Sequence, residues 1–218
     1  MKIEIWSDIV CPFCYIGKRR FENALSNFNQ KDQIEVIYRS FQLNPDIKTD
    51  TDKSVVQYLS ESKSVSLEKA REMTEYVTQQ AAIEGLDYQM DHAVVANTFR
   101  SHRLLQLALA QALQLETKER LLKAYFIEGE NIDDIPTLIK LSNEIGLTNV
   151  AETLRSDNYS NEVKRDLLES KQIGIQGVPF FVFNRKYGVS GAQESKVFAE
   201  AIEQSFKEWA EAALQSKD

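Results

Sequence analysis

The sequence predicts an α/β domain interrupted by a large all-helical insertion, and three observations carry this prediction. Strand-like segments occur only near the two ends of the 218-residue chain. The stretch between about 45 and 170 shows only helical periodicity. The helix between the first two strands is long enough for a right-handed crossover, so these strands should be parallel. The predicted order is βαβ, then helices, then a β-hairpin and a closing helix.

The N-terminal unit contains a strand over 2–6, a helix over about 15–29 and a strand over 34–41. Ile3 and Ile5 occupy alternate positions of the first strand. The same two-residue period continues through the second strand. This alternation is typical of strands that have one face against a core.

Six helices are expected in the insertion, from apolar residues at helical spacing and from capping residues. The helix over 97–115 is apolar almost all round and should be the most buried. The first helix covers 67–81 and ends at Gly85, the second covers 97–115, and the third contains Leu121, Leu122, Tyr125 and Phe126 and ends near Gly129. The fourth begins at Asp134 and Pro136 and ends at Gly146. The fifth is short and capped by Thr148, and the sixth is capped by Ser160 and ends near Gly174.

The C-terminal unit begins with the continuous apolar run 180–183, which is typical of a strand covered on both faces. Asn184-Arg185 then makes a turn into a partner strand over 186–190, and a helix follows over about 194–209. We therefore predict a discontinuous domain, 1–44 with 175–218, and a helical insertion domain, 45–174.

Composition and charge exclude several classes of function. The chain is 43% hydrophobic and 27% charged, like an ordinary soluble protein. Its net charge is −7 and it has no basic run, so nucleic acid is not an expected partner. No apolar stretch approaches the roughly 18–20 residues that span a bilayer. Residues 1–8 lack the apolar core of a signal peptide, so a cytoplasmic location is expected.

The two cysteines of the chain form the motif Cys11-Pro12-Phe13-Cys14 between the first strand and the first helix. A helix N-terminus carries partial positive charge, which favours a thiolate on Cys11 and lowers its expected pKa. Pro12 suits the first helical position. Phe13 supplies no cation, so we expect a milder oxidant than a C-P-H-C protein. The spacing predicts a disulfide that forms and breaks.

The two cysteines have two other possible interpretations. A pair of packing cysteines is the simpler one, but the strand-to-helix context favours redox chemistry. A zinc site would need His92 and His102, which lie ten positions apart rather than at the spacing of a zinc finger. No metal ligand is therefore assigned.

A second part of the site is indicated by Gly177-Val178-Pro179, directly before the apolar strand. A proline is tolerated at the first position of a strand, because its missing N–H is not needed there. From the residues alone, the Val178–Pro179 bond is either trans or cis.

Five segments of the chain match the motifs of a known family in the same order. They are 7–17, 41–45, 97–104, 174–182 and 186–193. With these motifs the chain resembles the DsbA-like thioredoxin-fold oxidoreductases, and within them the FrnE-like cytoplasmic branch. This resemblance implies a thioredoxin fold with a helical insertion.

The resemblance implies the following roles. Cys11 is the partly exposed attacking thiolate, and Cys14, which is more buried, resolves the mixed disulfide. Pro179 is cis and packs beside the pair. The backbone of Val178 offers an edge to an extended substrate. Pro12 and Phe13 complete the substrate-binding surface, and the insertion covers one side of the cleft.

Further polar residues have two possible interpretations. Ser7, Asp8, Asn97 and His102 either line the cleft or act as packing, capping and core residues. His102 shares a helix face with apolar residues, which favours a core histidine bonded to a carbonyl. Some FrnE-like proteins carry a second cysteine pair near the C-terminus, and this chain has none. An internal dithiol relay is thereby excluded.

The predicted function is that of a cytoplasmic thiol–disulfide oxidoreductase or isomerase that acts on protein or small-molecule disulfides. No cofactor is expected, and glutathione or another thiol is the expected redox partner. One alternative is a glutathione-dependent isomerase or transferase, like the 2-hydroxychromene-2-carboxylate isomerases. The other is a non-catalytic adaptor that uses the same cleft, because a fold alone does not fix a function.

Overall fold

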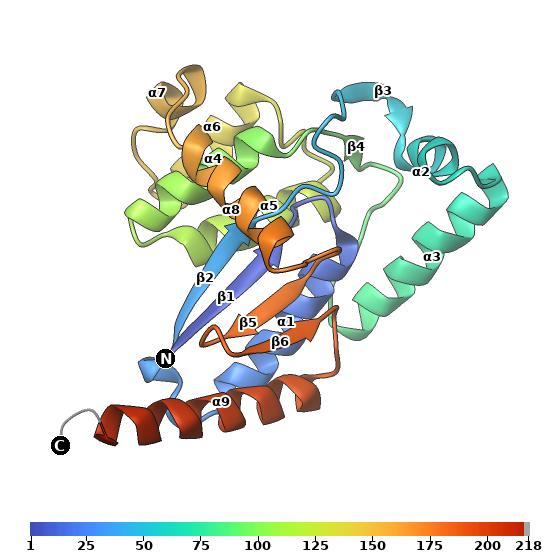
Figure 1. The fold of residues 1–218 in the computed structure, drawn as a ribbon. Helices are drawn as coiled ribbons and strands as arrows, with labels where there is room; N and C mark the ends of the chain where they lie inside the picture. Colours follow the sequence, from blue (N-terminus) through green and yellow to red (C-terminus); the bar gives the residue numbers. More distant parts are fainter. Residues whose placement is uncertain (216–218) are drawn as a thin grey trace.

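A four-stranded sheet forms the centre of the computed structural model, which describes residues 1–215 (Figure 1). Its strand order is β2-β1-β5-β6. Strand β1 pairs parallel with β2 and antiparallel with β5, and β5 pairs antiparallel with β6. The predicted parallel pair and C-terminal hairpin are confirmed. The strands are β1 (Lys2–Ser7), β2 (Glu35–Ser40), β5 (Phe180–Phe183) and β6 (Tyr187–Ser190).

Helices cover both faces of this sheet. Helices α1 (Pro12–Ser26) and α9 (Ser195–Gln215) pack on the face that carries Ile3 and Ile5. On the opposite face, the Trp6 indole donates a hydrogen bond to the Asp166 carbonyl of α8 (3.2 Å). Figure 1 shows α8 in front of β2, and α9 along the bottom of the molecule in this view. Helix α8 spans Ser160–Gln172.

The insertion surrounds a large apolar core, which also includes Tyr15 and Ile16 of α1, and it adjoins β2. It is not purely helical, because residues 50–54 and 94–95 pair as an antiparallel ribbon. The prediction of helices alone is therefore wrong in this stretch. The sequence pattern does not predict this ribbon, because its first strand is Asp-Thr-Asp-Lys-Ser, which has no apolar alternation. Its elements are β3 (Asp50–Ser54), α2 (Val55–Lys63), α3 (Leu67–Ile83), β4 (Val94–Val95), α4 (Phe99–Ala110), α5 (Gln114–Phe126), α6 (Ile135–Glu144) and α7 (Val150–Arg155).

The helix predicted over 97–115 is interrupted. Helix α4 ends at Ala110, Ala112 adopts a left-handed φ of 57°, and α5 begins at Gln114. The Gln114 side chain accepts from the Tyr38 N–H and donates to the Tyr38 carbonyl, both at 2.9 Å. A long-range contact therefore fixes the start of α5. The local sequence contains no Gly or Pro from which the interruption between α4 and α5 could be predicted.

Helix caps agree with the sequence in part. Asp134 accepts from the Thr137 N–H at 2.9 Å and caps α6, as predicted. Thr148 and Ser160 were expected to cap α7 and α8, and these predictions are wrong. Residues in left-handed conformation precede these helices instead, Asn149 and Tyr159 respectively. The predicted domain boundaries, 1–44 with 175–218 against 45–174, stay a prediction.

Candidate functional site

The cysteine pair lies where β1 passes into α1. Cys11 is the N-cap residue of α1, Pro12 is at its first position, and the Cys14 N–H donates to the Cys11 carbonyl at 3.0 Å. Both cysteines are free thiols and are buried, with 4% and 2% of their surface exposed. Cys11 is therefore less exposed than the resemblance implied. Even so, Cys11 lines the adjoining cleft.

The second wall of the site comes from a chain segment more than 160 positions away. The Cys11 thiol donates a hydrogen bond to the Val178 carbonyl at 3.4 Å. The Val178–Pro179 peptide bond is cis, as the resemblance implied. Close packing here requires a glycine in α1, because a Cβ on Gly17 would lie 2.9 Å from Pro179 Cγ. The fold thus brings the predicted residues Cys11, Val178 and Pro179 together.

The two thiols titrate as a pair because they share a hydrogen bond. That bond and burial raise the pKa of Cys11 well above its usual value. Burial also raises the pKa of Cys14, but the hydrogen bond from Cys11 and the positive charge of Lys118 outweigh burial and leave it lowered. The lowered pKa expected at Cys11 is thus wrong for the dithiol, in which Cys14 is the more acidic of the two thiols.

Asp8 ties the loop after β1 to two other segments. Its carboxylate accepts from the backbone N–H groups of Ile9 and Leu43, each at 2.8 Å. His102 Nε2 of α4 lies 3.2 Å from the same carboxylate. Asp8 and His102 are each 1% exposed. Asp8 contributes to the cleft wall, whereas His102 lies behind it as a partner of Asp8.

Asn97 and Ser7, two further residues considered for the cleft, lie outside its lining. The Asn97 amide donates to the carbonyls of Pro45 and Ile47, at 3.2 and 2.8 Å, and so holds the loop that follows β2. Ser7 is buried, and its hydroxyl contributes to lowering the pKa of Cys14. Neither side chain is among those that line the cleft.

A cleft of about 590 Å³ opens beside Cys11, between the sheet domain and the insertion. Phe13 stands at its edge with 40% of its surface exposed. Among the described residues that line it, Asp8 and Lys63 are the charged ones, so the wall is largely apolar. The lining residues are Asp8, Val10, Cys11, Pro12, Phe13, Leu43, Asn44, Ile47, Val55, Tyr58, Leu59, Ser62, Lys63, Met73, Thr74, Val77, Met90, Val95, Ala96, Thr98, Tyr125 and Val178.

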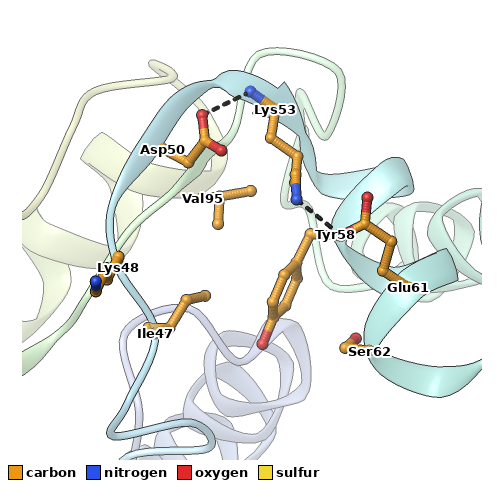
Figure 2. Close-up of a pocket in the computed structure, with 8 residues that line it drawn as sticks. All are labelled: Ile47, Lys48, Asp50, Lys53, Tyr58, Glu61, Ser62 and Val95. Carbon is orange, nitrogen blue, oxygen red and sulfur yellow. Dashed lines mark hydrogen bonds and ion pairs between the residues drawn. The ribbon is translucent and has the colours of Figure 1, made fainter.

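A second pocket of about 340 Å³ adjoins this cleft (Figure 2). Its walls come from the ribbon and from α2, and Figure 2 shows the Tyr58 ring between Ile47 and Glu61. The ammonium of Lys53 pairs with Glu61 at 2.7 Å, so these two charges neutralise each other. The two pockets share Ile47, Tyr58, Ser62 and Val95. The insertion thus extends the cleft away from the cysteines.

Lys118 is a site residue that sequence analysis missed. It lies on α5, is fully buried, and contributes to lowering the pKa of Cys14. A signal existed, because Lys118 precedes Leu121, Leu122 and Tyr125 at three, four and seven positions and therefore shares their apolar face. A lysine on a buried face needs an explanation, because burying an unpaired charge is costly.

Neither a metal cluster nor a bilayer-crossing helix is found in residues 1–215. No group of three or more His, Cys, Asp or Glu side chains in this range lies close enough together to hold a metal ion. No helix in this part of the chain is both long and apolar enough to cross a bilayer.

Comparison with known proteins defines the class. The DSBA-like thioredoxin domain matches residues 2–203, and the chain belongs to this family. The solved structure of a probable DsbA oxidoreductase, SCO1869 from Streptomyces coelicolor, is 38% identical, with a TM-score of 0.88 over 95% of this chain and 91% of that one. The uncharacterized protein YwbO of Bacillus subtilis (strain 168) is 28% identical over 92% of this chain and 94% of its own length.

More distant solved structures share the fold alone. The cytosolic disulfide reductase DsbM from Pseudomonas aeruginosa is 15% identical, with a TM-score of 0.65 over 98% of this chain and all of that one. A 2-hydroxychromene-2-carboxylate isomerase is 14% identical, with a TM-score of 0.67 over 97% and 99% of the two chains. The predicted thioredoxin fold and DsbA-like family are confirmed.

Proposed function

We propose that this protein is a cytoplasmic thiol–disulfide oxidoreductase that works through Cys11 and Cys14. The observation that carries the proposal is the meeting of two thiols, at a helix N-terminus, with the Val178 carbonyl 3.4 Å from Cys11 Sγ. A single thiol beside that backbone would form a mixed disulfide with a substrate sulfur but could not by itself release that sulfur as a thiolate. A second thiol one helical turn away allows that release.

The reaction runs in two exchange steps. Once the pair has lost one proton to solvent, transfer of the other from Cys11 to Cys14 frees the Cys11 thiolate, which attacks a substrate disulfide RS–SR′ and expels R′S⁻. Cys14 then loses its proton and attacks Cys11 Sγ, and RS⁻ leaves. The enzyme dithiol is oxidised by two electrons and the substrate is reduced by two. The reverse sequence oxidises a substrate dithiol, and repeated partial exchange isomerises disulfides.

The cleft suggests which substrates are accepted. Its largely apolar wall favours a peptide or small-molecule disulfide with an apolar group next to the sulfur. The backbone of Val178 pairs with an extended substrate, and Pro12, Phe13 and Pro179 pack against it. Glutathione is the proposed small-thiol partner, supported by the solved complex of DsbM with GSH. The cytosolic location in the name of that protein supports the proposed compartment.

A redox titration of the Cys11–Cys14 couple in glutathione buffers, read by alkylation of free thiols, tests the proposal. We expect one reversible two-electron transition in the wild type and none in Cys11→Ser or Cys14→Ser. Cys14→Ser should also accumulate a mixed disulfide at Cys11, whereas Cys11→Ser should not. If the wild-type pair forms no intramolecular disulfide, the mechanism fails. A glutathione-dependent isomerase or a binding adaptor then becomes the better hypothesis.

A further inference from the structure

The Lys118 side chain ends in the protein interior without a hydrogen-bond partner. Its Nζ is fully enclosed, and no acceptor among the described residues lies within bonding distance. It lies over the face of the Tyr38 ring, with Nζ 5.4 Å from the ring centroid. Buried lysines are normally paired, so an unpaired one indicates a function that stability alone would not select.

The position of Lys118 is fixed by contacts on either side of it along α5. Gln114, one turn earlier, bonds both backbone groups of Tyr38 in β2. Glu119, the next residue, accepts from the Tyr15 hydroxyl at 2.6 Å and from Arg19 at 2.9 Å, both in α1. Helix α5 is therefore bound to a strand and to the helix that carries the cysteines. Lys118 projects between these two attachments, and its charge is not free to turn towards solvent.

The electrostatic neighbours of Lys118 come from three elements. They are the Cys11 and Cys14 thiols and Lys18 of α1, the Asp8 carboxylate at the end of β1, and the Tyr38 phenol of β2. Burial lowers the pKa of Lys118 to about 8, and Cys14 and Asp8 oppose that shift. Asp8 is already occupied by two backbone N–H groups and by His102. Cys14 is therefore the neighbour whose negative charge, once the thiol is ionised, is left to pair with the Lys118 ammonium.

We propose that Lys118 is the charge partner of the resolving sulfur, and that its ammonium lets Cys14 ionise in a site closed to water. This inference rests on the proposed function and deepens it. When Cys11 is held in a mixed disulfide, Cys14 still carries a proton. That proton passes to the R′S⁻ released in the first exchange or to solvent outside the site, which leaves a thiolate beside an ammonium rather than a thiol beside an amine. The thiolate electron pair then forms the bond to Cys11 Sγ, the mixed-disulfide bond breaks, and RS⁻ departs with its electrons.

The two steps can be observed separately with DTNB, an aromatic disulfide that releases a coloured thiolate at each exchange. The first release reports attack by Cys11, and the second reports resolution by Cys14. In stopped-flow experiments, Lys118→Met should slow the second release about tenfold at neutral pH, because one unit of thiol pKa changes the thiolate fraction about tenfold. Its rate-against-pH curve should move up by about one unit, while the first release changes much less.

Lys18→Met is the matched control. Lys18 is also a buried lysine near the pair, with 4% of its surface exposed, but it is already bonded to Glu22 and Glu119. Its replacement should leave the pH profile of the second release in place. Loss of the first release in the wild type would contradict the proposed function itself. A normal first release, with an unchanged second release in folded Lys118→Met, would overturn only the role of Lys118.

A measurement on the wild type covers the case in which the variant does not fold. The Cε resonance of Lys118 in ¹³C-lysine-labelled protein reports the protonation of its amine directly. We expect a higher pKa for Lys118 in the dithiol form than in the disulfide form, because only the dithiol form can place a thiolate beside it. Equal pKa values in the two forms would refute the pairing.

Discussion

Two buried lysines near the cysteine pair have opposite surroundings. Lys18 of α1 donates to Glu22 at 2.6 Å and also bonds Glu119, so two carboxylates face its one charge. Lys118 of α5 has no bonded partner at all among the described residues. Lys18 belongs to an ion-pair cluster that joins α1 to α5, whereas the charge of Lys118 acts on the two cysteines without a hydrogen bond to either. The comparison separates a lysine that holds helices together from one whose charge is left for the chemistry.

The largest expected effect concerns stability. Lys118 has a pKa of about 8 in the folded chain against an ordinary value of 10.5. This shift of about 2.5 units corresponds to a cost on the order of 3 kcal/mol at neutral pH. Lys118→Met removes that cost and keeps most of the buried volume. Denaturant unfolding should show the variant to be more stable than the wild type at pH 7, although it is slower in resolution.

The sign of the pH dependence follows from proton binding. Between pH 8 and 10.5 the unfolded chain holds a proton on this lysine that the folded chain does not. The unfolding free energy of the wild type therefore increases as the pH rises through this window, and the difference in stability between Lys118→Met and the wild type becomes smaller there. Below pH 8 the advantage should be complete. A variant less stable than the wild type at pH 7 would mean that Lys118 has a structural role.

A smaller effect on stability is expected from Glu119, one of the two carboxylates that pair with Lys18. Burial raises the pKa of Glu119, but hydrogen bonds from Arg19 and the charge of Lys18 outweigh burial and lower it to about 2. Glu119→Gln should destabilise the protein by roughly 1–2 kcal/mol, a value reduced because a third of this side chain is exposed to screening solvent. The stabilisation by Glu119 is present above its ordinary pKa of 4.5 and is lost as pH falls towards 2.

Unfolding curves of the wild type and Glu119→Gln at several pH values check this prediction. The two proteins should converge as the pH falls through that window. The resolution step should change little, because the substituted amide would still hold α5 near α1 by polar contacts while Lys118 keeps its place. A tenfold loss of resolution in Glu119→Gln would instead show that the ion-pair cluster, and not Lys118 alone, controls Cys14.

Local patterns in the sequence predicted the parts of the site that depend on neighbouring residues. The strand-to-helix position of Cys11 and Cys14 follows from alternation before the motif and helical spacing after it. The strand over 180–183 and its hairpin appear where expected, with Asn184 and Arg185 at φ of 49° and 58° in the turn. Such features are visible because propensity, turn chemistry and hydrophobic period all act over a few residues.

What the sequence did not predict depends on distant contacts. The interruption before Gln114 is fixed by the Tyr38 backbone, 76 positions away. Thr148 bonds Gln111 instead of capping α7, which no local rule would indicate. The unpaired state of Lys118 depends on which carboxylates the fold brings near. Glu119, its neighbour in sequence, is committed to α1, and only the three-dimensional arrangement reveals that.

The smallest effect tests whether the Tyr38 ring helps Lys118 to remain charged. An aromatic face near an ammonium contributes about 0.5–1 kcal/mol at ordinary sites, so Tyr38→Leu should slow the second DTNB release only about twofold. Tyr38→Phe keeps the ring and should resolve at the wild-type rate, which makes it the matched control. Equal slowing in both variants would assign the effect to the phenol hydroxyl. No slowing in either would leave the negative charges of Cys14 and Asp8, and not the ring, as what stabilises the Lys118 ammonium, and the contrast with the fully paired Lys18 would then be sharper.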